Sequence, residues 1–480
     1  MSMQKLTGAL GVLVLLSACS AGPNFKTPAP LRVDAYTSKN EAVPFVRRIE
    51  LGKRIETDWW ALFASKALNG VVRQVVDNNN DLTSAKETLA QAEEAVKAES
   101  GNLLPQASLG AIAGRQKYGA ALFGPANFSI PPFTYYELGP SVSWTPDFFG
   151  GEHRAVERQQ ALANYQAHEV DAMYVTLTGD TVAAALDMAA ANAEMAALGK
   201  VIAEDKTIRQ LVQSAYEAGS ATKMDILSAQ SQLNSDQAML PSLKQRLSIS
   251  RHALSIFVGK APANWVPPDF QLSDFTLPQA LPVSLPSELV KKRPDILAAE
   301  ANLHAASAGV GVATANLYPQ LTLSANMMQE ALTPAGLFSL TNNAWSLAAG
   351  LSAPIFNGGT LSAQKRGAEH AYRASLAQYR QTILVAFRQV ADALTSLAHD
   401  DEEIVTMTNA VNTASASLDL SRASYQAGAI GLLQTQDVQR TEAKVQLDMI
   451  RAQHARDLDC VRLFVALGGS PINPAIQHLP

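Results

Sequence analysis

The strongest chemical signal in the sequence is a cysteine near the N-terminus. Lys5 precedes an apolar run at residues 6–16, and the tetrapeptide Leu-Ser-Ala-Cys ends at Cys19. The run is too short to cross a bilayer as a helix and is typical of a secretory signal. The tetrapeptide has the pattern of a lipobox, in which a peptidase cuts before the cysteine and the thiol is acylated. We therefore predict a signal peptide at residues 1–18, with a diacylglycerol and an N-acyl chain on Cys19. An ordinary signal peptide with an incidental cysteine is the alternative.

The other reactive side chains form no recognisable catalytic set in the sequence. Cys460 lies in an apolar helical pattern, which is typical of a buried thiol rather than a nucleophile. The charged run at residues 399–403 could suggest a metal site, but a solvated stretch of a long helix is the simpler interpretation. Gly309 and Gly311 lie in an alanine-rich helix, where they allow a neighbour to approach closely. We therefore predict no catalytic, cofactor-binding or metal residues, and no enzyme.

Composition and length set further limits. The net charge is −5, and the sequence holds no basic cluster that could follow a phosphate backbone, so nucleic acid is not an expected partner. A chain of 480 residues can bury a large core and is long enough for two or three domains.

Long helical patterns dominate the second half of the chain. Between residues 355 and 470, apolar residues recur every three or four positions, which is the period of one helix face. The break is a Tyr-Gln-Ala-Gly tetrapeptide ending at Gly428, and glycine readily takes the left-handed conformation after a helix. We predict two helices folded back on each other there. A helix of about 60 residues rises about 90 Å and must be paired along its length.

The first half carries a copy of this hairpin. A Tyr-Glu-Ala-Gly tetrapeptide ends at Gly219, and its surroundings match those of Gly428 in one register. Upstream blocks match in the same order, about 210 residues apart, which is too long a period for a solenoid unit. We therefore predict an internal two-fold repeat, with long helical hairpins whose tips lie at residues 216–220 and 425–429.

Four segments alternate between apolar and small polar residues, two in each half. We predict strands at about residues 106–116, 136–147, 320–328 and 344–354. Strands of about ten residues with one apolar and one small polar face suit a membrane β-barrel, with lipid outside and water inside. A sandwich sheet with one wet face is the alternative. The secretory signal and the lack of further strands favour the barrel.

Four strands are too few to close a barrel, for which about eight is the practical minimum. A membrane sheet cannot leave an edge unpaired, so several chains must share one barrel. Two chains would supply eight strands, and three would supply twelve.

The expected domain organisation follows from these elements. The signal peptide at residues 1–18 precedes an extended segment at 19–57, the first repeat at 58–260, a proline-rich linker at 261–287, the second repeat at 288–470 and a C-terminal segment at 471–480.

Four blocks of sequence resemble the TolC family of outer-membrane factors, in the lipoprotein branch that works with resistance–nodulation–division (RND) efflux pumps. They are Cys19 with Gly-Pro-Asn-Phe-Lys-Thr-Pro at 22–28; Asp-Trp-Trp-Ala-Leu-Phe at 58–63; Leu-Pro-Val-Ser-Leu-Pro at 281–286, running into Lys-Arg-Pro-Asp-Ile at 292–296; and Pro-Ile-Phe-Asn-Gly-Gly at 354–359. The blocks occur in order across nearly the whole mature chain. The departures are a lysine pair at 291–292 in place of a usual arginine, and Gln434.

The resemblance implies a fold that is mainly α with a membrane β-barrel. Three chains would contribute four strands each to one 12-stranded barrel in the outer membrane, and their helical hairpins would continue it as an α-barrel through the periplasm. The N-terminal segment, residues 261–287 and the C-terminus would form an equatorial collar. Ser20, in place of aspartate after the cysteine, favours the outer membrane of a Gram-negative bacterium. The implied partners are outer-membrane lipid, a periplasmic membrane-fusion adaptor and an inner-membrane RND transporter.

The resemblance also assigns the hairpin tips to adaptor docking. The tip residues are Tyr216, Gly219, Ser220, Tyr425, Gly428 and Ala429. The alternative is that the glycines serve only the turns.

Two carboxylates follow the tips at similar heights on similar helix faces. They are Asp225 and Asp437, and three copies would place six carboxylates at the periplasmic mouth of the pore. Gln434 occupies a position where the family often has aspartate. We therefore expect a periplasmic constriction formed by Asp225, Gln434 and Asp437. The alternative is that both acids are solvated helix-surface residues.

The leading hypothesis is a passive exit duct for drugs or other small toxic compounds, energised by the inner-membrane pump. Metal-ion efflux and type I protein secretion are alternatives within the same class, although the sequence shows no methionine or histidine cluster of the kind that metal transport would favour. A non-conducting coiled-coil lipoprotein scaffold is the alternative from another class, but a scaffold would not need the four strands.

Overall fold

The computed structural model describes residues 21–29, 33, 35–37, 48–52, 58–118, 131–277 and 280–469. The predicted signal peptide, Cys19 and the segment 471–480 lie outside the described residues. The chain forms two compact units. One comprises Leu89–Gln166 and Ala299–Tyr379 with the described residues up to Pro28, and the other comprises the remaining described residues from Ala29 onwards. Each unit therefore draws on both halves of the sequence.

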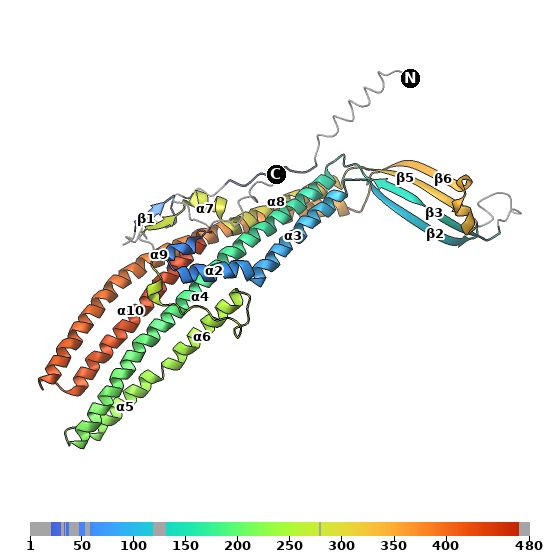
Figure 1. The fold of residues 1–480 in the computed structure, drawn as a ribbon. Helices are drawn as coiled ribbons and strands as arrows, with labels where there is room; N and C mark the ends of the chain where they lie inside the picture. Colours follow the sequence, from blue (N-terminus) through green and yellow to red (C-terminus); the bar gives the residue numbers. More distant parts are fainter. Residues whose placement is uncertain are drawn as a thin grey trace. The chain divides into compact units, whose positions relative to one another are not determined.

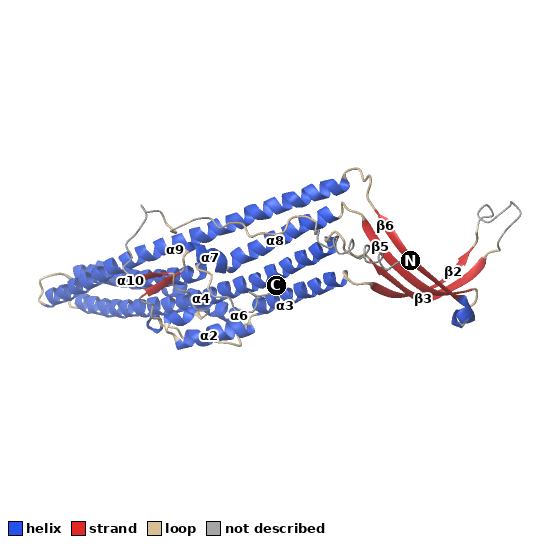
Figure 2. Ribbon diagram, turned by 90° about the horizontal axis from the view of Figure 1, so that it is seen from above, coloured by secondary structure: helices blue, strands red, loops and turns tan. Residues whose placement is uncertain are grey.

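The first unit contains a four-stranded antiparallel sheet. Its strands are β2 (Gln106–Gln116), β3 (Phe133–Trp144), β5 (Gln320–Ala331) and β6 (Asn343–Ser352), paired in the order β2-β3-β5-β6 (Figures 1 and 2). The short 3-10 helices η5 (Pro334–Phe338) and η6 (Leu340–Asn342) join β5 to β6. Within the described chain, β2 and β6 each keep one unpaired edge.

One strand begins and ends earlier than the sequence predicted. The alternation indicated a strand at about 136–147, whereas β3 runs from Phe133 to Trp144. Pro146 explains the early end, because proline has no N–H to donate to a ladder. The last residue of the strand is Trp144, whose indole N–H donates to the carbonyl of Leu103 at 2.9 Å.

The register separates the sheet into an apolar and a polar face, since residues opposite each other in antiparallel strands lie on the same face. On the apolar face, Ala325 lies opposite Leu347, and Met327 opposite Trp345. The side chains of Trp345 and Leu347 are 70% and 75% exposed. On the other face, the hydroxyls of Ser108 and Ser141 lie 2.8 Å apart, and Ser346 donates to Asn326 at 3.1 Å.

Four helices contribute residues to both units. They are α3 (Asn80–Gly101) and α8 (Pro294–Ala315), each of 22 residues, and α4 (Gly151–Glu217) and α9 (Thr360–Gln426), each of 67 residues. At a rise of 1.5 Å per residue, each of the two longer helices corresponds to about 100 Å. Along the described residues, every helix falls short of the length or the apolarity that crossing a bilayer requires.

Residues 22–25 are anchored in the first unit. Gly22 has φ 85°, and a Cβ added there would meet the Cα of Gly311 at 2.5 Å. The Arg154 guanidinium donates to the Asn24 side chain at 2.6 Å, and Phe25 stacks on His304 with ring centroids 4.4 Å apart. The close approach predicted for the Gly309–Gly311 region therefore occurs at Gly311. A Cβ added at Gly309 would meet nothing within 4 Å.

The second unit holds the remaining elements. They are β1 (Arg48–Leu51), η2 (Trp59–Phe63), α2 (Lys66–Asn78), α5 (Lys223–Gln237), α6 (Leu240–Phe257), η4 (Leu272–Asp274), β4 (Ala280–Val283), α7 (Pro286–Lys292) and α10 (Leu432–Ala466). Strands β1 and β4 pair in parallel, joining the N-terminal segment to the proline-rich linker. The buried ring of Trp59 stacks on Phe464 at 5.4 Å and meets Phe63 edge-on.

The returning helix of the first hairpin is interrupted, which the sequence copy did not predict. Helix α5 ends at Gln237 and α6 begins at Leu240, whereas α10 continues over 35 residues. Pro241 lies in the first turn of α6, where its missing N–H costs nothing. In a continuous helix it would remove the bond to the Gln237 carbonyl and clash with it.

Candidate functional site

The tip of the first hairpin is closed by a left-handed glycine. After α4, Gly219 has φ 77° and its N–H donates to the Tyr216 carbonyl at 2.9 Å. The N–H of Ser220 donates to the Ala215 carbonyl at 2.8 Å. This pair of bonds is a Schellman motif, which satisfies the last carbonyls of a helix.

The tip of the second hairpin has the same geometry. Gly428 has φ 73°, and its N–H donates to the Tyr425 carbonyl at 2.9 Å. The N–H of Ala429 donates to Ser424 at 2.9 Å. Several apolar side chains at the tips are exposed, namely those of Tyr216, Met224, Leu227, Tyr425 and Leu433. The two tips are therefore a matched pair of surfaces.

Asp225 has a local structural role at the first tip. Its carboxylate accepts the Thr222 N–H at 2.8 Å, and the Thr222 hydroxyl caps the Asp225 N–H at 3.3 Å, so the two residues form a capping box for α5. The bond from the Thr222 N–H lowers the pKa of the Asp225 carboxyl below its ordinary value. Asp225 is therefore ionised at neutral pH.

The two predicted constriction residues on the second hairpin are exposed on α10. Gln434 and Asp437 lie in its first two turns. Asp437 is 4.0 Å from the Arg440 guanidinium, with both side chains more than half exposed. Asp225 and Asp437 are thus each engaged within their own helix.

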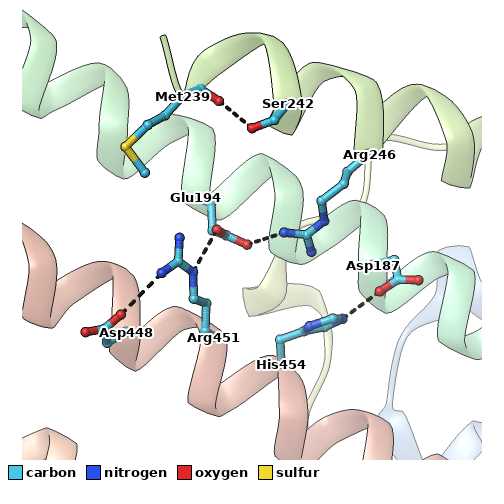
Figure 3. A network of polar contacts seen from close by, with 8 residues as sticks. All are labelled: Asp187, Glu194, Met239, Ser242, Arg246, Asp448, Arg451 and His454. Atoms are coloured by element: carbon cyan, nitrogen blue, oxygen red, sulfur yellow. Dashed lines mark hydrogen bonds and ion pairs between the residues drawn. The ribbon is translucent and has the colours of Figure 1, made fainter. Parts of the chain in front are cut away.

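A buried carboxylate joins the two hairpins. Glu194 on α4 is 1% exposed, and Figure 3 shows it between two guanidinium groups. Its Oε1 lies 2.9 Å from Arg246 Nη1 on α6, and its Oε2 lies 3.2 Å from Arg451 Nε on α10. His454 Nε2 on α10 lies 2.9 Å from Asp187 Oδ1 on α4. The sequence offered one signal for this junction, an acidic residue inside the alanine-rich run around Glu194.

A second junction joins α4 to both α9 and α10. Glu204 on α4 accepts from Gln439 on α10 at 2.5 Å and from Arg422 on α9 at 3.3 Å. Gln439 is buried, although it is a polar residue in a helical stripe. Together, Glu194 and Glu204 connect the first hairpin to both helices of the second.

The Lys-Arg-Pro-Asp block centres on a buried arginine. Arg293 is 7% exposed and donates to the Ala466 carbonyl at 2.7 Å, near the end of α10. It also bonds Asp295 at 2.8 Å and contacts Gln389 on α9. This block therefore fastens the α7–α8 junction to the base of the second hairpin.

Two of the five residues in the charged run at 399–403 are withdrawn from solvent, which corrects the sequence interpretation. Asp401 is 7% exposed, and Asp400 faces Asp459 on α10. Burial, together with the Asp459 carboxylate, raises the pKa of Asp400 to about 7. Cys460 is fully buried, as its apolar pattern predicted. No group of three or more metal-ligating side chains occurs among the residues that the structure describes.

The comparisons with known proteins agree with this architecture. A family model described as outer membrane efflux protein matches residues 71–260 and 285–469. The chain is 31% identical over 485 residues to the pyoverdine export outer membrane protein OpmQ of Pseudomonas aeruginosa, covering 98% of this chain and 97% of that protein. It is 28% identical to the toluene efflux pump outer membrane protein TtgF of Pseudomonas putida, covering 98% of each.

A solved structure gives the same result. The outer-membrane channel OprN superposes with a TM-score of 0.86 at 27% identity, covering 94% of this chain and 99% of that one. Fold and relatives together define an outer-membrane efflux channel of the TolC type, not an enzyme. The chain belongs to the outer membrane efflux protein family. The resemblance seen in the four sequence blocks is thereby confirmed.

Proposed function

We propose that three copies of this chain form one passive exit duct through the outer membrane. The observation that carries this proposal is the four-stranded sheet, with its exposed apolar face and its hydroxyl-rich opposite face. Such a sheet suits lipid on one side and water on the other. The unpaired edges of β2 and β6 must be satisfied in a membrane, and neighbouring copies can supply the missing partners.

Native mass spectrometry in detergent, followed by planar-bilayer recording, tests this assembly. We expect three chains in one particle and ion conductance from that particle. A trimer without conductance would favour the lipoprotein scaffold. A monomer or dimer that conducts would refute the shared 12-stranded barrel.

The internal repeat is part of the same proposal. Helices α4 and α9 have equal lengths, as do α3 and α8, and both hairpin tips end in the same Schellman motif. A duplicated unit within each of three chains would give the α-barrel pseudo-sixfold symmetry. This arrangement would place twelve helices around one duct.

The proposed cargo is small toxic compounds, delivered by an inner-membrane RND transporter through a periplasmic adaptor. Relatives named for toluene and pyoverdine support export of small molecules. Deleting the gene and complementing it tests the cargo. We expect the deletion strain to accumulate a fluorescent organic cation such as ethidium and the complemented strain to export it. Hypersensitivity to silver or copper alone would favour metal-ion efflux, and loss of a secreted protein would favour type I secretion.

The adaptor is proposed to dock on the two tips. The exposed apolar residues around Tyr216 and Tyr425 support this, because such patches commonly mark binding surfaces. Photo-crosslinkers at Ser220 and Ala429 should capture the adaptor in cells that assemble the pump. A crosslinker on the exposed Lys97 of α3 is the control. Capture from Lys97 alone would overturn the assignment.

The proposed constriction consists of Asp225, Gln434 and Asp437 from each chain. Six ionised carboxylates in a narrow mouth would attract cations and repel anions. The Asp225→Asn and Asp437→Asn double variant should therefore lower cation selectivity and weaken block by trivalent cations in single-channel recordings. Unchanged selectivity and block would place these carboxylates outside the pore.

The mature N-terminus is proposed to be Cys19, with a diacylglycerol and an N-acyl chain. More than one acyl chain anchors a protein stably, because each buried CH₂ contributes about 0.8 kcal/mol. The anchored residues Gly22 to Phe25 lie shortly after this position. Mass spectrometry of the N-terminal peptide should show the lipid mass on Cys19, and an unmodified cysteine there would contradict the proposal.

A further inference from the structure

A partly open cavity between three helices of the second unit has the properties of a ligand site. The cavity has a volume of about 340 Å³ and lies between α4, α5 and α10. This volume is at the small end of the range for small-molecule pockets. Much of its wall is apolar, with Leu198, Ile208, Ala229, Ala443 and Leu447. One end is acidic, where Asp205 of α4 meets Asp236 of α5.

Asp205 is a buried acid in the wall of this cavity. It is 8% exposed, and its Oδ2 has no hydrogen-bond partner among the described residues. Asp236 faces it and accepts from Gln232 at 2.8 Å. A buried carboxylate oxygen without a donor is costly. The facing Asp236 can satisfy it only by sharing a proton, and a cation bound in the same cavity is the other way to satisfy it.

The cations near the cavity are engaged elsewhere. Arg451 bonds Glu194 and Asp448, as Figure 3 shows, and Arg440 lies 4.0 Å from Asp437. Lys444 is exposed on the rim. On the acidic side, Glu204 is held by Gln439 and Arg422. The charge of Arg440 acts on Asp205 and lowers its pKa, but among the described residues Arg440 forms no ion pair with Asp205 or Asp236.

Titration of the carboxyl pair agrees with a missing cation. Burial and the facing Asp236 raise the pKa of Asp205 to about 7. Two carboxyl groups that meet in a poorly solvated place share a proton when no cation is present. A bound cation would take the place of that proton.

We propose that this cavity binds a small organic cation, a protonated amine whose ammonium group lies between Asp205 and Asp236 and whose apolar body fills the space against α10. Asp205 and Asp236 supply charge-assisted acceptors for the ammonium donors. A divalent metal ion fits less well, since calcium requires six to eight oxygen ligands and the acidic end offers two carboxylates. The site lies between α4, α5 and α10, and neither Asp225 nor Asp437 is among its lining residues.

Isothermal titration of the purified full-length protein with phenethylammonium chloride tests the proposal, with the isosteric neutral 2-phenylethanol as the comparison. We expect one amine per chain and at least about tenfold weaker binding of the alcohol, the loss expected for a charge-assisted contact. Near pH 7, binding of the amine should displace the proton that Asp205 and Asp236 share. The released proton is taken up by the buffer, so the measured heat of binding should depend on the ionisation enthalpy of the buffer. Equal affinity of the two probes, or no binding of the amine at millimolar concentration, would overturn the proposal.

Variants locate the site. Asp205→Asn should weaken amine binding about tenfold and abolish proton release, and Ala443→Phe should block the amine by filling the cavity. Glu402→Gln removes an exposed acid from α9 and should leave binding unchanged. The Asp225→Asn variant, which changes a tip carboxylate outside the cavity lining, should also bind normally. Loss of binding in Asp225→Asn, or full binding in Asp205→Asn, would assign the amine to another place and refute the cavity site.

Discussion

At the scale of single residues, buried charges decide how the two hairpins are joined. Glu194 has two guanidinium partners, and both of these side chains remain about half exposed. Water can therefore solvate either arginine if the pair is broken, whereas the carboxylate cannot reach solvent. The carboxylate is the group whose desolvation must be compensated.

We predict that replacing both arginines destabilises the protein more than the sum of the single changes. Arg246→Met and Arg451→Met each leave Glu194 one partner, while the double variant leaves it unpaired at a cost of about 3–5 kcal/mol. Adding Glu194→Leu should restore much of that stability. Denaturant unfolding measures the cycle. Arg388→Met, which breaks an exposed ion pair with Asp392, should cost less than about 1 kcal/mol. An additive double variant would contradict this account.

The Asp400–Asp459 pair should make stability depend on pH. The folded-state pKa of Asp400 is raised to about 7, so the folded chain holds an extra proton that the unfolded chain releases near pH 4. Stability should then fall as pH rises from about 4 to 7. Asp400→Asn should stabilise the protein by about 1–2 kcal/mol above pH 8 and by almost nothing near pH 4. The gain above pH 8 is limited because Asp400 keeps some contact with solvent, which screens its charge.

Thermal unfolding at several pH values measures this effect. Asp392→Asn, an exposed acid on the same helix, is the control and should show little pH-dependent gain. A gain from Asp400→Asn that does not change between pH 4 and 8 would exclude proton linkage as its cause.

At the scale of elements, the alternation of the strands sets a different requirement on each face of the sheet. Leu347 and Ser346 are neighbours on β6, and the register places them on opposite faces. The first would meet lipid and the second would line the water-filled side.

We predict that Leu347→Arg prevents membrane assembly and that Ser346→Arg does not. A cationic side chain on the lipid face costs about 2–4 kcal/mol at the bilayer midplane, whereas the lumen face can hydrate it. Trimer yield in the outer-membrane fraction is the measurement. Equal yields from the two variants would argue against a lipid-facing Leu347 and for a sheet with another partner.

At the scale of the whole molecule, each compact unit is built from both halves of the sequence. In the second unit, Trp59 stacks on Phe464, and Glu194 pairs with Arg451. These contacts join distant parts of the chain. The repeat is therefore not a pair of independent domains.

It follows that residues 19–287 and 288–480 should not fold as separate polypeptides. Each half would expose the apolar surface that the other half covers. This exposure costs about 25 cal/mol of folding free energy per Å² of apolar surface. Co-expression should restore protease resistance that neither half shows alone. Circular dichroism with limited proteolysis is the measurement, and a cooperative unfolding transition from one isolated half would show that the repeat is autonomous.

The sequence alone determined the features that depend on local periodicity and backbone conformation. The glycine tips at Gly219 and Gly428 were predictable because few other residues tolerate a positive φ at a helix end. The strand faces were predictable because side chains alternate with a period of two. The burial of Cys460 followed from its apolar helical neighbours.

Tertiary structure alone decided which polar residues are buried and with whom they pair. Glu194, Asp205 and Asp401 look like surface residues in the sequence, yet neighbouring helices bury all three. The capping role of Asp225 depends on where the chain leaves the tip, and the interruption before Pro241 was hidden by the match to an uninterrupted copy. Helical periodicity specifies which face of a helix is apolar. The charge that meets a given residue comes from another helix, often hundreds of residues away, and only packing brings the two together.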